Sequence, residues 1–167
     1  MRHGNAGKRL SSDTKDFSRP LTFEGKREVT DIAKSLKYLG VKFHFIITSP
    51  LKRAYQTASL VAMAFNSENK IEQWDELKPE GNRTALYRKL SEKFKKDSYI
   101  LIVGHEPYLS SLICEIISKG DVVNTASGHL VLRKAGLAKI RITSSHQRIQ
   151  GELRWLLTPK LIKRISK

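Results

Sequence analysis

The chain has 167 residues, of which 40% are hydrophobic, so residues 1–167 are long enough to form a single domain with a sizeable core. Its 31 Lys and Arg against 16 Asp and Glu give a net charge of +15, which favours acidic partners and phosphate above all. A single cysteine excludes an internal disulfide framework, and no apolar run approaches the roughly 18 residues that span a bilayer. Since the N-terminus also lacks the apolar region of a secretory signal, we expect a cytoplasmic protein without a membrane partner.

Helical and strand patterns alternate through the first two thirds of the chain. Apolar residues at three- and four-residue spacing predict helices at 22–39, after Ser49-Pro50, at 84–95 and at 107–120. Short β-rich runs predict strands at 43–48, 71–74 and 99–103. Strands separated by helices predict a three-layer α/β/α sandwich with a mostly parallel central sheet.

The pattern changes after Gly120. Short alternating runs at His129–Leu132, Lys139–Thr143 and Glu152–Leu157 predict antiparallel strands at the edge of the sheet. Residues 133–167 hold ten basic side chains and one acid, so +9 of the net +15 lies there. This segment is expected to form a solvated face, or to attract an acidic phosphoprotein. Nucleic-acid binding is not favoured, because no recognisable nucleic-acid module accompanies the charge.

Three segments share one pattern, in which a strand runs into a loop that carries Arg or His and a helix follows. They are Arg2-His3-Gly4, Ser49-Pro50-Leu51-Lys52-Arg53 and Gly104-His105-Glu106-Pro107. The carboxyl ends of parallel strands face one crevice, where helix N-termini also point, so we expect these side chains to converge there. The natural occupant is a phosphoryl group, whose oxygens Arg binds in a bidentate way, and the sequence therefore predicts phosphate or sulfate in this pocket.

The two histidines suggest phosphoryl transfer. An imidazole is a competent nucleophile at neutral pH when a carbonyl or carboxylate holds its other nitrogen. A second, protonated histidine would stabilise the phosphoryl oxygens together with the arginines. Phosphoryl transfer needs mainly positioning and charge neutralisation, which this set supplies without a metal or another cofactor.

The chain resembles the histidine phosphatase (phosphoglycerate mutase-like) superfamily and, within it, the SixA-type phosphohistidine phosphatases. The resemblance rests on Arg2-His3-Gly4, Arg19-Pro20-Leu21-Thr22 with Gly25, Ser49-Pro50 with Arg53-Ala54 and Gln56-Thr57, and Gly104-His105. Weaker similarity lies in Glu76-Leu77-Lys78-Pro79 with Gly81, and in Gly151, Trp155 and Pro159. The ordered set covers nearly the whole chain.

The resemblance implies that His3 is the nucleophile and is transiently phosphorylated, and that Arg2, Arg53 and His105 hold the phosphoryl oxygens. Asn5 is expected to support them. It implies a metal-independent phosphatase that hydrolyses phosphohistidine on a phosphotransfer or signalling protein. Small-substrate members often add a lid, for which this short chain has little room.

The resemblance leaves two carboxylates as candidates for the proton donor. Glu76 lies where the mutase-like branch places its acid, and Glu106 lies where the acid-phosphatase branch commonly has Asp. Water has a pKa of about 15.7, so an alkoxide leaving group needs a donor. An imidazole leaving group, with a pKa of about 6.5, is already protonated in part near neutral pH. A weak or absent acid therefore fits phosphohistidine better than a phosphate monoester.

One departure from the family concerns the first strand. Members carry several apolar residues before Arg-His-Gly, whereas only Met1 precedes it here, so we expect this strand to be truncated or missing and His3 to lie at a frayed terminus. Two other functions remain open. One is a phosphatase of small phosphate monoesters from the same superfamily, and the other is a non-catalytic basic module that binds phosphate or nucleic acid.

Overall fold

The computed structural model of the protein describes residues 1–9, 12–95, 97–118, 130–144 and 149–165. Its helices are α1 (Asp13–Phe17), α2 (Phe23–Tyr38), α3 (Lys52–Phe65), α4 (Arg83–Lys93), α5 (Tyr108–Ile117) and α6 (Pro159–Ile165), with the short 3-10 helices η1 (Glu68–Lys70) and η2 (Asp75–Leu77). Its strands are β1 (Phe45–Thr48), β2 (Ile71–Gln73), β3 (Ile100–Val103), β4 (Leu137–Ser144) and β5 (Gln150–Leu157). None of the helices in the described ranges is long and apolar enough to cross a membrane.

The central sheet is parallel, with the strand order β2-β1-β3. In its register, Ile46 of β1 lies opposite Ile71 of β2 and Leu101 of β3. Because parallel strands need a crossover connection, each of these strands is joined to the next through helical segments. The predicted α/β fold with a mostly parallel sheet is confirmed.

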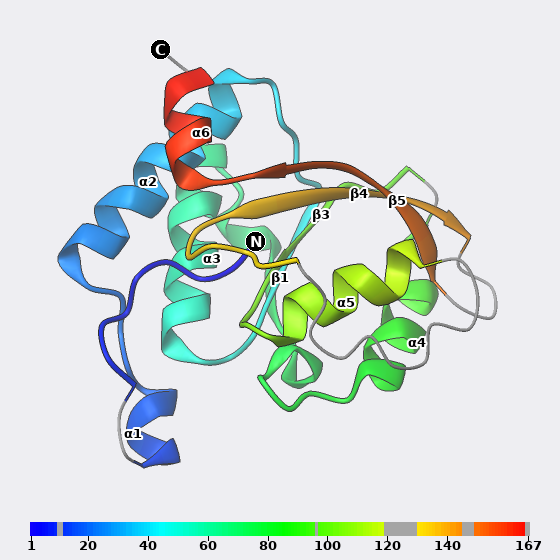
Figure 1. Cartoon of the computed structure of the whole chain (residues 1–167), viewed down its shortest axis with the longest axis horizontal. Helices are drawn as coiled ribbons and strands as arrows, with labels where there is room; N and C mark the ends of the chain where they lie inside the picture. The colour runs from blue at the N-terminus through cyan, green and yellow to red at the C-terminus, as the bar shows by residue number, and fades with distance from the viewer. Residues whose placement is uncertain (10–11, 96, 119–129, 145–148, 166–167) are drawn as a thin grey trace.

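Successive residues of β1 face opposite layers of the molecule. Ile46 packs in a core formed mainly with α2, α3 and α6, and Ile47 packs in a second core formed with α4 and α5. Figure 1 shows these two groups of helices on opposite sides of the sheet. Because side chains alternate along a strand, a consecutive apolar run such as Phe45-Ile46-Ile47 fits a strand that is covered on both faces.

Residues 1–3 lie between β3 and the residues that lead into β4. The Arg2 N–H donates to the Gly136 carbonyl, and the His3 N–H donates to the Gly104 carbonyl, both at 3.0 Å. Only an isolated parallel bridge between Arg2 and Gly104 is formed, so the prediction of a truncated first strand is confirmed. The expected fraying is not seen, because backbone hydrogen bonds hold this short segment on both sides.

The antiparallel strands predicted at 139–143 and 152–157 are confirmed as β4 and β5. They form a two-stranded sheet of their own, however, and not the predicted edge of the central sheet. The predicted strand at His129–Leu132 is wrong for residues 130–132, which form no strand, and His129 lies outside the described residues. Leu132 is instead fixed by its buried side chain and by its carbonyl, which accepts a hydrogen bond from Arg2 at 3.0 Å. These two contacts hold Leu132 in place without the backbone hydrogen bonds of a paired strand.

Candidate active site

His3 lies directly after the Arg2–Gly104 bridge and is 7% exposed. Its Nδ1 donates to the Gly4 carbonyl at 2.7 Å, because a carbonyl oxygen can only accept. Nε2 is then the nitrogen with the free lone pair. The pKa of His3 is lowered to about 4, mainly by burial, while the hydrogen bond to Gly4 opposes this shift and the positive charges of Arg53 and Arg2 add to it. His3 is therefore neutral at physiological pH, which is the form that a nucleophile requires.

His105 follows β3 and is 2% exposed. Its ring centroid lies 5.1 Å from that of His3, with 56° between the ring planes. Nε2 shares a hydrogen bond of 2.8 Å with the Ser49 hydroxyl, whereas Nδ1 is buried without a partner among the described residues. Burial lowers the pKa of His105 to about 3, with His3 and Arg53 acting in the same direction. His105 is therefore neutral in the phosphate-free protein, and the expectation that it is protonated beside a bound phosphoryl group stays a prediction.

Arg53 lies in the first turn of α3 and is 5% exposed. Its Nη2 forms an ion pair of 3.1 Å with Asp16, and its Nη1 donates to the Asp16 carbonyl at 2.8 Å. The other carboxylate oxygen of Asp16 accepts from Nε of Arg19 at 2.7 Å. Nε of Arg53 is buried and lacks a partner in the described part of the chain. One donor of this guanidinium thus remains for a ligand.

Arg2 is half-buried beside His3. Its Nη1 donates to the Leu132 carbonyl at 3.0 Å, and its Nε is buried with no partner in the described ranges. Burial lowers the pKa of the Arg2 guanidinium, and the Glu106 carboxylate opposes that shift. The structure therefore brings together Arg2, His3, Arg53 and His105, and three of these side chains keep a buried nitrogen that no described residue satisfies.

Helix α3 supports the loop that carries His3. The Gly4 N–H donates to the Thr57 hydroxyl at 3.1 Å, and that hydroxyl donates to the Arg53 carbonyl at 2.8 Å. A Cβ on Gly4 would lie 2.7 Å from Val29 of α2, so only glycine fits between these elements. Thr57 thus couples the backbone beside the first histidine to the helix turn that carries the arginine.

Ser49 holds His105 in place. The helix predicted after Ser49-Pro50 is α3, which begins at Lys52 with Leu51 as its N-cap residue, so Ser49 does not cap it. The Ser49 hydroxyl binds His105 instead and also accepts a longer hydrogen bond of 3.4 Å from the Leu51 N–H. A buried serine at the end of β1 thereby fixes the orientation of the imidazole at the end of β3.

The two candidate acids have different surroundings. Glu76 lines a cavity of about 590 Å³, which we call the η2 cavity, and Asp16 lines the same cavity. The Glu76 carboxylate forms an ion pair of 3.2 Å with Lys89. Glu106 accepts a hydrogen bond from the Ser110 hydroxyl, and its other carboxylate oxygen is buried without a partner among the described residues. Both side chains are partly buried, but only Glu76 lines the η2 cavity, whereas the charge of Glu106 acts on Arg2.

Asn5 does not join the cluster through its side chain. Its Oδ1 accepts from Lys134 Nζ at 2.7 Å and from the Gly7 N–H at 3.4 Å. Its backbone carbonyl accepts from the Thr22 N–H at 2.9 Å, at the start of α2. The side-chain contacts are therefore structural, and the expectation that the amide supports phosphate stays a prediction.

Sequence reasoning missed Asp16 and underrated Arg19 as a site residue. Asp16 lies three residues before Arg19, which is the spacing of an i, i+3 ion pair, and this was the only local signal. The contact between Asp16 and Arg53 joins distant segments and could not be read from spacing.

Comparison with known proteins gives consistent matches. The family model of the histidine phosphatase superfamily (branch 1) matches residues 1–79. The phosphohistidine phosphatase SixA of Escherichia coli (strain K12) is 31% identical over 117 residues, which cover 70% of this chain and 71% of that protein. An uncharacterized protein of Picosynechococcus sp. is 35% identical over 165 residues, covering 96% and 94% of the two chains.

Solved structures of the same fold cover nearly the whole chain. The structure of the protein histidine phosphatase SixA complexed with tungstate has a TM-score of 0.79 and 25% identity, and the match covers 96% of this chain and 95% of that one. A phosphoglycerate mutase from Bacillus anthracis has a TM-score of 0.70, with 99% and 94% of the two chains covered. At 16% identity, this second likeness concerns the fold alone.

Proposed function

Because the chain belongs to the histidine phosphatase superfamily, whose members are phosphatases and mutases, we propose that it is a phosphohistidine phosphatase with His3 as its nucleophile. The observation that carries this proposal is the buried pair of neutral imidazoles, His3 and His105, between two arginines that retain unpaired donors. The likeness to SixA proteins, at 31% and 25% identity, supports phosphohistidine as the substrate.

In the first step, Nε2 of His3 attacks the phosphorus atom of the substrate. The bond between phosphorus and the substrate imidazole breaks, and its electron pair stays on the leaving nitrogen, which takes a proton from solvent or from a nearby acid. The Nδ1–H bond to the Gly4 carbonyl keeps the ring oriented and disperses the positive charge that develops on it. In the second step, water attacks the phosphorus and loses a proton to solvent, while the bond between phosphorus and Nε2 of His3 breaks and its electron pair returns to Nε2. Inorganic phosphate and neutral His3 are released.

Cationic donors stabilise the charge on the transferring oxygens. Arg53 and Arg2 each have a buried Nε without a partner among the described residues, and each would donate it to a phosphoryl oxygen. His105 is neutral before phosphate binds, and the arriving phosphate anion favours its protonation, so the Nδ1–H that is now without a partner among the described residues becomes a further donor to a phosphoryl oxygen. We propose that these groups suffice without a bound metal.

The leaving group decides how much acid catalysis the site needs. Imidazole leaves readily near neutral pH because its pKa is about 6.5, whereas an alkoxide requires a positioned acid. Glu76 lines the η2 cavity but its carboxylate is held by Lys89. This arrangement favours phosphohistidine over an alkyl phosphate.

A second candidate function is hydrolysis of small phosphate monoesters. It is favoured by one observation, the position of Glu76 on the cavity beside the Arg53–Asp16 pair, from which a carboxylic acid could protonate an alkoxide. In that case Glu76→Gln would abolish turnover.

The proposed function is tested by comparing kcat/KM for a phosphohistidine peptide with kcat/KM for an alkyl phosphate such as 3-phosphoglycerate. The proposal predicts a preference for the phosphohistidine peptide of at least about a hundredfold, in line with the contribution of a general acid that only the alkoxide needs. Turnover of the alkyl phosphate alone would replace it with the second candidate.

A further inference from the structure

The 133–136 turn, which leads into β4, is fastened to the N-terminal segment that carries His3. The Ala135 N–H donates to the His3 carbonyl at 3.1 Å, and the Gly136 carbonyl accepts from the Arg2 N–H at 3.0 Å. Figure 1 shows the N-terminus beside this segment, which is drawn in yellow. The turn therefore lies directly beside the proposed phosphoryl site.

The backbone of this turn is fixed, whereas its two cationic side chains are accessible. The Gly136 N–H closes the turn by donating to the Arg133 carbonyl at 2.7 Å. Ala135 is fully buried and has a φ of 56°, a left-handed conformation that a residue with a Cβ adopts only where its surroundings hold it. Arg133 and Lys134 are both exposed. A rigid turn thus presents two charged side chains at the edge of the site.

The charges of these two side chains are not neutralised within the described part of the chain. Lys134 donates its Nζ–H to the amide oxygen of Asn5, which is a neutral acceptor, and neither cation forms an ion pair with a described carboxylate. Residues 130–144 contain no Asp or Glu. Burial lowers the pKa of the Arg2 guanidinium, Glu106 opposes this shift, and the charge of Arg133 adds to it. The positive field of the turn therefore reaches the site.

The two cavities beside the site have no such excess of cations. In the η2 cavity, three of the four lining carboxylates form ion pairs with arginines or lysines. A smaller cavity beside Asn5 is lined by two acids and two cations, namely Glu24, Glu28, Arg27 and Lys163. The unbalanced positive charge beside the site therefore lies at the 133–136 turn.

An exposed apolar side chain precedes the two cations. Val131 is 62% exposed, whereas Leu132 is buried and its carbonyl accepts from Arg2 at 3.0 Å. We call Val131, Arg133 and Lys134 the basic rim. A protein partner buries apolar area together with charge, whereas free phosphate contacts the charge alone. The basic rim therefore fits a protein surface better than a free anion.

We propose that the basic rim docks an acidic surface of the protein that carries the phosphohistidine, and so favours phosphohistidine with acidic neighbours. The inference rests on the proposed phosphohistidine phosphatase function and names the kind of partner for the same site. Complementary charges at an exposed rim act mostly on the rate of encounter, and each exposed pair is worth little, so we expect a preference of about fivefold in kcat/KM at low salt. The preference shrinks as added salt shortens the Debye length.

The first experiment compares two phosphohistidine peptides of equal length, one flanked by Glu and one by Gln. The wild-type protein should hydrolyse the Glu-flanked peptide faster, Arg133→Glu should remove this preference, and Arg133→Lys should keep it. The ratio of the two kcat/KM values is the measured quantity, because a variant that only disturbed Arg2 would slow both peptides alike. Equal kcat/KM for the two peptides in the wild type would overturn the inference.

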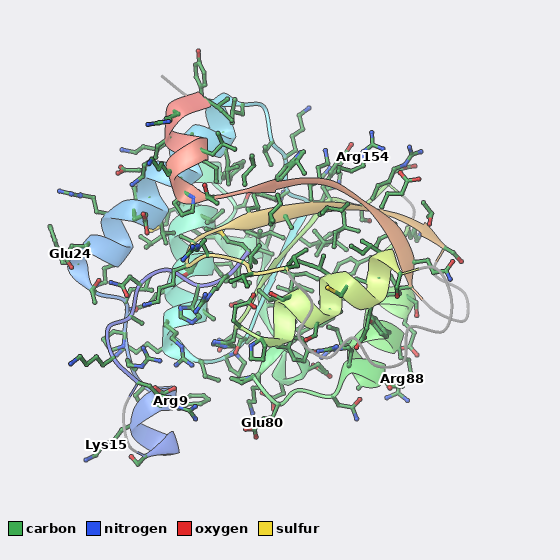
Figure 2. All side chains as sticks on the ribbon, viewed as in Figure 1. Arg9, Lys15, Glu24, Glu80, Arg88 and Arg154 are labelled. Carbon is green, nitrogen blue, oxygen red and sulfur yellow. The ribbon has the colours of Figure 1, made fainter. Side chains whose placement is uncertain are left out.

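Arg88→Glu is the matched control, because it makes the same change in net charge at an exposed residue of α4. Figure 2 shows Arg88 on the other side of the molecule from Arg9, whose charge acts on Arg53. Arg88→Glu should keep the preference for the Glu-flanked peptide. Loss of the preference in both variants would assign it to net charge and overturn the docking surface.

The second experiment separates this inference from the proposed function. Calorimetry measures the Kd of the Glu-flanked and Gln-flanked peptides with a non-hydrolysable phosphonate in place of the phosphohistidine. Tighter binding of the Glu-flanked peptide, lost in Arg133→Glu and kept in Arg88→Glu, supports the docking surface even where neither phosphohistidine peptide is hydrolysed. Equal Kd values contradict it even where phosphohistidine is turned over. A single-stranded oligonucleotide that binds more tightly than the Glu-flanked peptide, and loses affinity in Arg133→Glu, would assign the basic rim to nucleic acid instead.

Discussion

The imidazole of His3 lies 5.1 Å from that of His105, and neither ring forms a hydrogen bond with a carboxylate of the described residues. Their nitrogens instead meet the Gly4 carbonyl and the Ser49 hydroxyl. Burial lowers their pKa values to about 4 and about 3. Before an anion binds, the two imidazole rings are therefore neutral and the guanidinium groups around them are positive.

This pair makes stability depend on pH. An unfolded histidine has a pKa of about 6.5, so between pH 6.5 and about 4 the unfolded chain binds more protons than the folded one. The free energy of unfolding therefore falls as the pH falls through this window, by up to about 1.4 kcal/mol per pH unit for each histidine. Urea unfolding at several pH values, for the wild type and for His105→Asn, measures this contribution.

As the pH falls through this window, the free energy of unfolding of His105→Asn should decrease less steeply than that of the wild type. His44→Asn is the control, because His44 is exposed and lies outside the site. The interpretation of a buried neutral pair is contradicted when His105→Asn and the wild type have the same slope.

Arg53 is expected to contribute strongly to turnover. Arg53→Ala removes a buried guanidinium whose Nε is unpaired, and loss of one preorganised donor to a developing anion lowers kcat by about 10²–10³-fold. Steady-state kinetics on a phosphohistidine peptide checks this. Lys52→Ala, which removes the exposed neighbouring cation, should change kcat/KM little. An unchanged kcat/KM in Arg53→Ala would exclude Arg53 from the site.

Asp16 is expected to act through Arg53 as a positioning residue. Asp16→Asn removes the charge that fixes Nη2 at 3.1 Å, and a small displacement of a positioning group costs up to about 10²-fold in rate. We predict that kcat falls by at least roughly tenfold while circular dichroism remains that of the folded protein. Glu92→Gln serves as the surface control. If kcat is retained in Asp16→Asn, Arg53 does not depend on this ion pair.

The two candidate acids are separated by their substrates. Glu76→Gln should slow hydrolysis of an aryl or alkyl phosphate more than hydrolysis of phosphohistidine, because only the oxygen leaving group needs a proton from the cavity side. Glu106→Gln should affect stability more than rate, since one carboxylate oxygen accepts a hydrogen bond from Ser110 and the other is buried. Both variants are assayed on both substrates, and a large loss of rate in Glu106→Gln alone would assign the acid to Glu106.

Much of the fold could be predicted because its signals are local. The spacing of Val29, Ile32 and Leu36 defines the buried face of α2, and Thr22 caps that helix by accepting from the Gly25 N–H. The apolar run in β1 predicted burial on both faces, which the two cores confirm. Local periodicity says less about residues 130–132, where the buried Leu132 side chain and the hydrogen bond from Arg2 are tertiary contacts.

The sequence predicted that four of the candidate side chains would converge, but it did not predict the electrostatics of the cluster or the presence of Asp16. Arg2, His3, Arg53 and His105 follow strand ends, and parallel topology brings such residues to one edge. The loss of the expected positive charge on His105 comes from burial, which no motif reports. The pairing of Asp16 with an arginine of α3 likewise depends on tertiary structure.

The most direct test of the account is to trap the phosphorylated enzyme and locate its phosphoryl group. The protein is mixed with a phosphohistidine peptide, quenched within milliseconds under alkaline conditions, digested and mapped by mass spectrometry. The account predicts one acid-labile phosphoryl group on His3 in the wild type and in His44→Ala, and neither adduct nor turnover in His3→Ala. Turnover by His3→Ala at the wild-type rate, or an adduct on another residue, would contradict it.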